Sequence, residues 1–297
     1  MRLIDPKNTP TSDFHQYLLG AVSPRPIAFA STIDEEGNLN LAPYSFFNCF
    51  SSNPPTLVFS SNRRVSDNTT KDTLHNIEQN KEVVINAVNY NIVRQMALTS
   101  ISYPSDVDEF KKAGLTPLAS DLVRPFRVKE SPAQMECRVK DIIKLGESGG
   151  AGHLIICEVL RMHVDEDVLD ESGKIDPHKI DLMGRMGRAF YVRASGSAIH
   201  KIFQSVVQIG VGFDQLPEGV RNSTILSGND LGQLASLVEL PDQNRIQQVK
   251  KEDDIVQQIL NTDSPRDGLH QYAKELLQKE DADKSYAMVI AMIGEEY

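Results

Sequence analysis

Hydroxyl groups, cations and the start of a predicted helix lie within one short stretch, residues 60–73. Thr70-Lys71-Asp72-Thr73 opens a helix that the apolar spacing predicts over residues 71–79. A helix N-terminus presents unpaired N–H groups and a partial positive charge, both of which favour phosphate. The stretch therefore predicts a phosphate cradle, with Ser60, Ser61, Arg63, Arg64, Lys71 and Thr73 as its side chains.

The same residues also fit an ordinary surface helix that Thr69 or Thr70 caps. Asp72 favours this alternative, because a carboxylate in the first turn already complements the helix dipole and would repel a phosphate. Residue types and spacing alone favour the capped surface helix over the phosphate cradle.

Three strands are expected ahead of this stretch, over residues 27–33, 38–42 and 56–60. Asp34-Glu35-Glu36-Gly37 makes the first turn, with Gly where a positive φ costs least. Pro43 is expected to stop the second strand, since it cannot donate to a ladder. Residues 44–53 are predicted to form a polar loop. At least one of Phe46, Phe47 and Phe50 is expected to be buried in the core.

Further along, strands are predicted over 82–87, 134–141 and 153–164, with a small hairpin over 168–176. Residues 12–18, 91–99 and 108–113 favour helices, and Pro104, Gly114, Pro117 and Pro125 mark a loop-rich insertion. With this many antiparallel strands a barrel is more economical than a sandwich, because closure removes open edges.

The character of the chain changes near Ala194. Helical spacing is found over residues 197–207, 230–238, 252–260, 269–279 and 284–293. From Pro241 to Tyr297 there are 12 acidic against 7 basic residues, which places −5 of the total charge of −10 in the last fifth. We expect an acidic, amphipathic helical extension.

Composition narrows the class of protein. The 297 residues carry a formal charge of −10, so neither a nucleic acid nor a membrane is an expected partner. Cys49, Cys137 and Cys157 are sparse and odd in number, and no apolar signal segment is seen, which predicts a cytoplasmic protein. No apolar run is long enough to span a bilayer.

The sequence lacks the motifs of several other kinds of enzyme and binding site. The Gly146–Gly152 segment is rich in glycine but has no Gly-Lys-Ser/Thr ending, so it is not a P-loop. There is no dinucleotide fingerprint, no Gly-x-Ser-x-Gly elbow and no metal-ligand spacing among the seven histidines. The sequence therefore predicts no metal site and assigns no catalytic residue.

The ordered set of motifs resembles the flavin reductase-like family of FMN-binding split barrels. The resemblance lies in PRPIAFAST, NLAPYSFFNCFSSNPPTLVFS, KDTLHNI and LMGRMGRAFY, and covers roughly the first two thirds of the chain. It implies a mainly β protein with a helical extension. Residues 1–195 would form an antiparallel split β-barrel, and residues 196–297 would add C-terminal α-helices.

The resemblance also assigns the candidate residues to FMN. Residues matching Lys71, Thr73 and the Ser/Arg loop hold the phosphate in the family, which implies a cofactor site made up of Tyr44, Ser45, Asn48, Cys49, Ser51, Ser60, Ser61, Arg63, Lys71, Asp72, Thr73 and Tyr191. Cys49 is expected to be a small buried residue beside the ring rather than a redox thiol. The family has Gly-Gly where this chain has Gly187-Arg188, so Arg188 could alter the backbone near Tyr191.

The implied activity is that of an FMN-binding oxidoreductase. NADH or NADPH would reduce the flavin, which would pass electrons to free flavin or another acceptor. The family places its flavin at a two-fold interface, which implies a homodimer. One alternative is an FMN-containing relay for a protein redox partner, and another is a non-catalytic flavin-binding module that docks a partner through the C-terminal helices.

Overall fold

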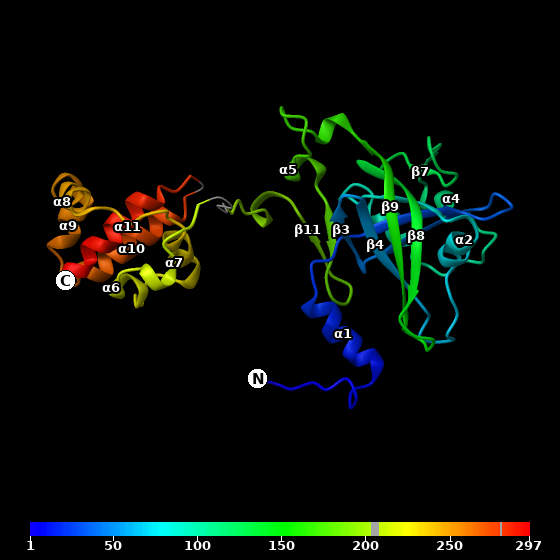
Figure 1. Cartoon of the computed structure of the whole chain (residues 1–297), viewed down its shortest axis with the longest axis horizontal. Helices are drawn as coiled ribbons and strands as arrows, with labels where there is room; N and C mark the ends of the chain where they lie inside the picture. Colours follow the sequence, from blue (N-terminus) through cyan, green and yellow to red (C-terminus); the bar gives the residue numbers. More distant parts are fainter. Residues whose placement is uncertain (203–207, 280) are drawn as a thin grey trace. The chain divides into compact units, whose positions relative to one another are not determined.

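The computed structural model divides into two compact units, residues 1–199 and 200–297, which are described separately (Figure 1). The structure describes residues 1–202, 208–279 and 281–297. Within those residues, no helix combines the length and the apolar character that a membrane crossing requires.

Unit 1 is built on one antiparallel sheet of seven strands, in the order β2-β1-β5-β8-β9-β4-β3. These strands are β1 (Ala28–Ile33), β2 (Leu39–Tyr44), β3 (Phe47–Ser52), β4 (Pro55–Asn62), β5 (Glu82–Asn86), β8 (Ala133–Lys144) and β9 (Gly152–Val164). The long strands β8 and β9 run side by side through its middle (Figure 1). Two small hairpins add β6 (Pro117–Leu118) with β7 (Arg127–Val128), and β10 (Met183–Arg185) with β11 (Tyr191–Arg193).

The sheet curls into a barrel, but its two end strands, β2 and β3, are not hydrogen-bonded to each other. The Tyr44 ring at the end of β2 lies 5.2 Å from the Phe59 ring of β4, although β2 and β4 are not hydrogen-bonded neighbours. The expected closure is therefore wrong in one respect, because β2 and β3 remain edges. The β2 edge is protected differently: the Leu41 N–H donates to Glu109 Oε2 at 3.0 Å.

Strand β1 is buried on both faces, which explains its unbroken apolar sequence. Ala28 and Ala30 share one core with Leu74 and Ile77 of α2 (Asp72–Asn80). Phe29 belongs to the opposite core, which α3 (Val93–Leu98) and α4 (Glu109–Ala113) cover. The helices thus fix the sheet from both sides and place the start of α2 against β2.

Two local predictions need correction. Pro43 does not end the second strand: β2 continues to Tyr44, because an edge strand can tolerate a residue without an N–H. Residues 47–52 form β3 rather than a loop, since ladder bonds to β4 satisfy their backbone despite the polar side chains. Phe47 packs against the barrel core as expected, whereas Phe50 is 68% exposed.

Other elements differ mainly in extent. The N-terminal helix α1 covers Thr11–Ala21, and the cap predicted at Thr69 or Thr70 falls instead on Lys71, without a side-chain hydrogen bond. The hairpin over 168–176 is reduced to a Leu169–Ile175 bridge flanked by a 3-10 turn (Glu166–Val168) and the short helix α5 (Pro177–Ile180).

Unit 2 consists of short helices around one apolar core. They are α6 (Glu218–Arg221), α7 (Gly228–Ala235), α8 (Gln243–Glu252), α9 (Asp254–Leu260), α10 (Pro265–Leu277) and α11 (Lys284–Ile293). The core gathers around α11, where six residues are buried. Helix α8 was not predicted, because only Ile246 and Val249 of its ten residues are buried. Within residues 197–202 of the predicted helix over 197–207, the structure shows a 3-10 turn at Gly196–Ala198; residues 203–207 lie outside the described residues.

Candidate functional site

The start of α2 forms one wall of a cleft of about 80 Å³. Tyr44, Lys71, Asp72 and Thr73 line this cleft, together with Arg64. The Lys71 ammonium lies 4.8 Å from the centre of the Tyr44 ring. Burial lowers the pKa of Lys71, and the nearby charge of Arg64 lowers it further. No ion pair joins either cation to a carboxylate among the described residues, which leaves both for an incoming anion, although the carboxylates of Asp72 and Glu109 line the same cleft.

Two buried hydroxyl groups near these cations lack hydrogen-bond partners. Tyr44 Oη and Ser61 Oγ are both enclosed, and neither makes a hydrogen bond within the described residues. Burial raises the pKa of Tyr44 to about 12; the Thr73 and Ser61 hydroxyls oppose this shift, although their geometry gives Tyr44 Oη no hydrogen bond. Buried polar groups are normally paired, so these two hydroxyls are available to a ligand that enters beside them.

Of the two arginines, the structure places Arg64 in the cleft rather than Arg63. Arg63 is engaged by its own loop: its Nε donates to Asn68 Oδ1 at 2.7 Å. Arg64 Nη1 donates to Thr69 Oγ1 at 2.8 Å and to the Thr70 carbonyl at 2.6 Å, which holds the guanidinium beside the helix start. Ser60 also points elsewhere, donating to Asn62 Oδ1 at 2.8 Å.

The glycine-rich segment supports this loop, a role that the sequence did not reveal. Gly150 N donates to the Arg63 carbonyl at 3.1 Å, and Arg63 N donates to the Ala151 carbonyl at 2.9 Å. A Cβ at Gly149 would lie 3.1 Å from the Arg64 carbonyl oxygen and the Val65 backbone. Glycine here allows one backbone to approach another, and the only signal in the sequence was composition.

The residues predicted to follow the ring and its chain lie on or near the edge strand β3. Ser45 precedes β3 and is partly buried, as is Ser51, whereas Asn48 and Cys49 are exposed. The expectation of a buried Cys49 is therefore wrong in the single chain, because β3 has no neighbour on its outer side. A β-bulge between Cys49 and Ser51 shifts the register of β3, so the side chains on either side of it no longer alternate regularly.

Tyr191 does not line the cleft. It lies on β11, where the Arg185 guanidinium stacks 4.5 Å from its ring centre, and it packs against the core that contains Phe29. Arg188 adopts φ +57°, the left-handed conformation that glycine favours, and its side chain is exposed. The tight turn is thus kept despite the arginine.

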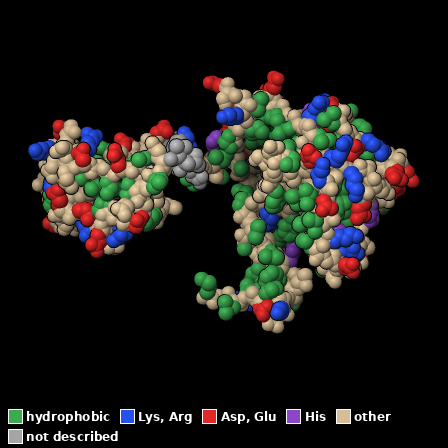
Figure 2. All heavy atoms as spheres, viewed as in Figure 1, with side chains coloured by type: hydrophobic (Ala, Val, Ile, Leu, Met, Phe, Trp, Pro, Cys, Tyr) green, Lys and Arg blue, Asp and Glu red, His purple; other side chains and the backbone are tan. Residues whose placement is uncertain are grey.

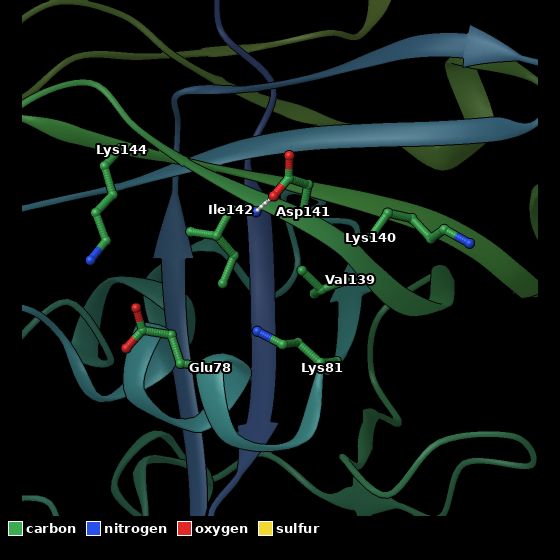
Figure 3. A pocket seen from close by; sticks show the side chains of 7 residues that line it. All are labelled: Glu78, Lys81, Val139, Lys140, Asp141, Ile142 and Lys144. Carbon is green, nitrogen blue, oxygen red and sulfur yellow. Dashed lines mark hydrogen bonds between the residues drawn. The ribbon is translucent and has the colours of Figure 1, made fainter.

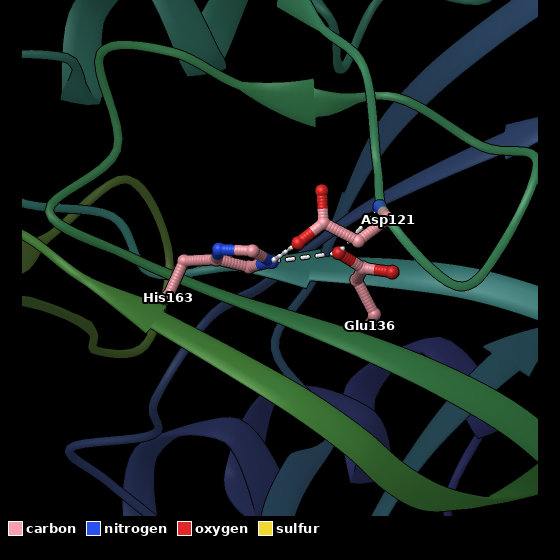
Figure 4. Close-up of side chains that lie close together, drawn as sticks. All are labelled: Asp121, Glu136 and His163. Carbon is pink, nitrogen blue, oxygen red and sulfur yellow. Dashed lines mark hydrogen bonds and ion pairs between the residues drawn. The ribbon is translucent and has the colours of Figure 1, made fainter.

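Away from the cleft, Asp121, Glu136 and His163 form a polar cluster (Figure 4). Glu136 on β8 lies at its centre and is fully buried. Its carboxylate accepts from the backbone N–H groups of Asp121 and Leu122 and contacts His163 Nε2 at 2.6 Å. Arg161 pairs with Asp121 at 2.8 Å. Because these groups already satisfy one another, the cluster acts as a latch between the 121–122 loop and the sheet.

A larger hollow of about 350 Å³ lies elsewhere, between the end of α2 and β8 (Figure 3). Charged side chains surround it, with Glu78 and Lys81 from the α2 side and Lys140, Asp141 and Lys144 from β8. None of the predicted cofactor residues lines it. Lys140 is already paired with Glu158 at 3.0 Å, so size alone does not make this hollow the better site.

Comparison with known proteins gives the family context. A model described as "Flavin reductase like domain" matches residues 20–182. An uncharacterized protein of Aquifex aeolicus is 38% identical over 196 residues, which cover 66% of this chain and 97% of that protein. Nitrilotriacetate monooxygenase component B from Bacillus cereus is 31% identical, with a TM-score of 0.63 over 69% of this chain and 98% of its own.

More distant structures show the fold alone. A putative flavin reductase with a split barrel domain from Shewanella frigidimarina has a TM-score of 0.58 at 24% identity, covering 69% of this chain and 100% of its own. An FMN-binding protein from Thermus thermophilus has a TM-score of 0.53 at 16% identity over the same shares. Unit 1 therefore has the split-barrel fold of flavin reductases, with an antiparallel β core.

Proposed function

The chain belongs to the flavin reductase like domain family, and we propose that it is an FMN-binding reductase. NADH or NADPH reduces the bound FMN, and the electrons pass to free flavin or another acceptor. The substrate of the reaction is thus a nicotinamide donor, and the flavin supplies the redox chemistry while the protein supplies position and electrostatics.

The observation that carries the proposal is the pair of cations at the start of α2, flanked by unpaired hydroxyls. Lys71 and Arg64 supply positive charge, and Tyr44 Oη and Ser61 Oγ are buried without partners. A phosphate monoester offers several acceptor oxygens and a negative charge, so it would satisfy these groups together. FMN carries such a phosphate and riboflavin does not. The polar side chains of β3 would then lie along the ribityl chain and ring.

We also propose a homodimer, because unit 1 exposes large apolar side chains. Val22 at the C-cap of α1 is 61% exposed, and Phe50 and Phe190 are 68% and 66% exposed. Figure 2 shows hydrophobic side chains gathered over α1 and the neighbouring face of unit 1. A second copy would cover this surface and place new groups against the open edge of β3. Sedimentation of the purified protein tests this, since a monomer at micromolar concentration would contradict it.

We propose two domains: residues 1–195 bind FMN, and residues 196–297 form a helical extension. Ending the chain after Ser195 should leave FMN affinity unchanged. A truncated protein that still folds but loses FMN would show instead that the extension forms part of the flavin site. Slow oxidation of NADH and NADPH by intact protein, with rapid reduction by a protein donor, would favour the relay alternative.

The reductase proposal is tested by absorbance spectra of the FMN-loaded protein under anaerobic conditions. Addition of NADH or NADPH should bleach the flavin bands promptly, and the faster nucleotide identifies the donor. Bands that persist with both nucleotides would contradict the reductase activity while leaving FMN binding intact. Absence of flavin bands after incubation with FMN would contradict the proposal altogether.

A further inference from the structure

A buried polar network joins three elements behind the cleft. Asn40 of β2 donates through Nδ2 to Thr32 Oγ1 at 2.9 Å and to Thr73 Oγ1 at 2.8 Å. From α2, Asn76 Nδ2 donates to the same Thr32 oxygen at 3.1 Å. All four side chains belong to buried residues, and Thr73 is only 1% exposed. Asn40 is thus the one member of the four that bonds both threonines.

The donor at Asn40 constrains what the Thr73 hydroxyl can do. A threonine hydroxyl has one proton to donate and two lone pairs that accept. Because Asn40 Nδ2 donates to Thr73 Oγ1, the hydroxyl proton must point away from Asn40. Asn40, Thr73, Lys71 and Arg64 all line the cleft, so the remaining directions include the side where the two cations lie.

We propose that Asn40 is a positioning residue that fixes the Thr73 hydroxyl as a hydrogen-bond donor to the phosphate of FMN. This inference rests on the proposed function, because it takes the cleft as the phosphate site. Asn40 acts through Thr73 and needs no contact with the phosphate. The phosphate oxygen would then gain a hydrogen bond from a hydroxyl that the protein has already oriented.

The test compares FMN and riboflavin affinities, measured by fluorescence titration of the full-length apoprotein. Asn40→Asp keeps the shape of the side chain but replaces the donor with an acceptor. The Thr73 proton then turns toward residue 40, and FMN should bind at least about tenfold more weakly, the usual scale for a charged hydrogen bond. Riboflavin affinity should stay within about threefold, since riboflavin makes no phosphate contact.

Two further variants separate orientation from the added negative charge. Asn76→Asp places the same charge in the same network but contacts only Thr32, so it should have less effect on FMN than Asn40→Asp. Thr73→Val removes the hydroxyl; Asn40→Asp added to it should cause little further loss if Asn40 acts through Thr73. Should Asn40→Asp fail to fold, Asn40→Ala and its Thr73→Val double variant are compared in the same way.

The outcomes distinguish this inference from the proposed function. FMN and riboflavin losing affinity equally, Asn76→Asp matching Asn40→Asp, or an undiminished loss in the Thr73→Val background would each overturn the role of Asn40. In all three cases wild-type FMN binding, and with it the proposed function, would stand. Wild-type protein that binds FMN no better than riboflavin would overturn both.

Discussion

Four helix starts of unit 2 differ from the start of α2 in unit 1 in how their N–H groups are satisfied. In unit 2, the side chains of Ser227, Asp242, Asp253 and Asp283 cap α7, α8, α9 and α11 by accepting from their first-turn N–H groups. In unit 1, α2 begins at Lys71 without a side-chain cap hydrogen bond. Its surroundings add a second cation, Arg64, and unpaired hydroxyls, together with the carboxylates of Asp72 and Glu109.

This contrast indicates which helix start is free for a ligand. A capped helix start has used its own acceptor, and in unit 2 the cap carboxylates add negative charge that would repel an anion. The α2 start has no side-chain cap and lies beside Lys71 and Arg64, with one carboxylate, Asp72, in its first turn. The four capped helix starts of unit 2 are thus satisfied by their own side chains, whereas the proposed function assigns the α2 start to a ligand.

The largest effect should come from removing the cation at the open helix start. Lys71→Ala should cost about 3 kcal/mol of FMN binding free energy, the upper end for a hydrogen bond to a charged group, and leave riboflavin almost unaffected. Lys81→Ala, at the other end of α2, is the matched control. Equal losses for both flavins would remove Lys71 from the phosphate role and break the contrast between the units.

A substitution of Glu136 tests the polar cluster of unit 1 in which the carboxylate already has its hydrogen-bond partners. Glu136→Gln should lower the free energy of unfolding by roughly 2 kcal/mol, because it leaves a buried backbone donor poorly matched. Chemical denaturation measures this, with Glu158→Gln in an exposed ion pair as the control, expected to cost less than about 1 kcal/mol. No difference between the two variants would contradict the latch.

The same variant has a defined pH signature. Burial raises the pKa of Glu136, but the Asp121 and Leu122 N–H groups and His163 outweigh burial and hold it below its ordinary 4.5. The resulting stability is present above that value and is lost as pH falls through the folded-state pKa. Glu136→Gln should therefore reduce the acid sensitivity of unfolding below about pH 4.5. An unchanged acid profile would mean that other groups determine it.

A smaller effect is expected for a helix cap in unit 2. Asp253 accepts from the Ile255 and Val256 N–H groups and from the Tyr286 hydroxyl. Asp253→Ala should destabilise unit 2 by about 1 to 2 kcal/mol, the usual range for a lost N-cap. FMN affinity should not change. A loss of FMN affinity in folded Asp253→Ala protein would show that unit 2 influences the flavin site.

The smallest expected effect is an increase in the stability of unit 2. Gly232 lies within α7, and a Cβ there would meet no atom within 4 Å. Gly232→Ala should stabilise unit 2 by about 0.5 to 1 kcal/mol, because alanine loses less backbone entropy in a helix. A melting curve that follows unit 2 measures this. Destabilisation instead would mean that the α7 surface has a contact outside the chain.

The sequence predicted the elements with strong periodicity and missed those set by tertiary contacts. Helix α11 has the predicted bounds because its apolar residues recur in a long uninterrupted run. Strand β3 was missed because its polar side chains lie on an edge, where ladder bonds rather than burial maintain the strand. Pro43 was misjudged for a related reason, since only the sheet order shows that β2 is an edge.

The residues that line the candidate cleft were predicted in part, for similar reasons. Lys71 and Thr73 lie two residues apart in the sequence, so the helix start places both in the cleft. Choosing between Arg63 and Arg64 depends on which guanidinium the 63–70 loop engages, and Asn40 reaches Thr73 only through packing of β2 on α2. Such contacts between distant segments leave no local spacing for a sequence to show.

The most direct test of the central claim is the affinity of the wild-type protein for FMN and for riboflavin, measured side by side. If the start of α2 binds the phosphate, FMN should bind at least about a hundredfold more tightly, equivalent to about 2.7 kcal/mol. Added inorganic phosphate should compete with FMN. Equal affinities for the two flavins would contradict the phosphate site and the contrast between the two units that rests on it.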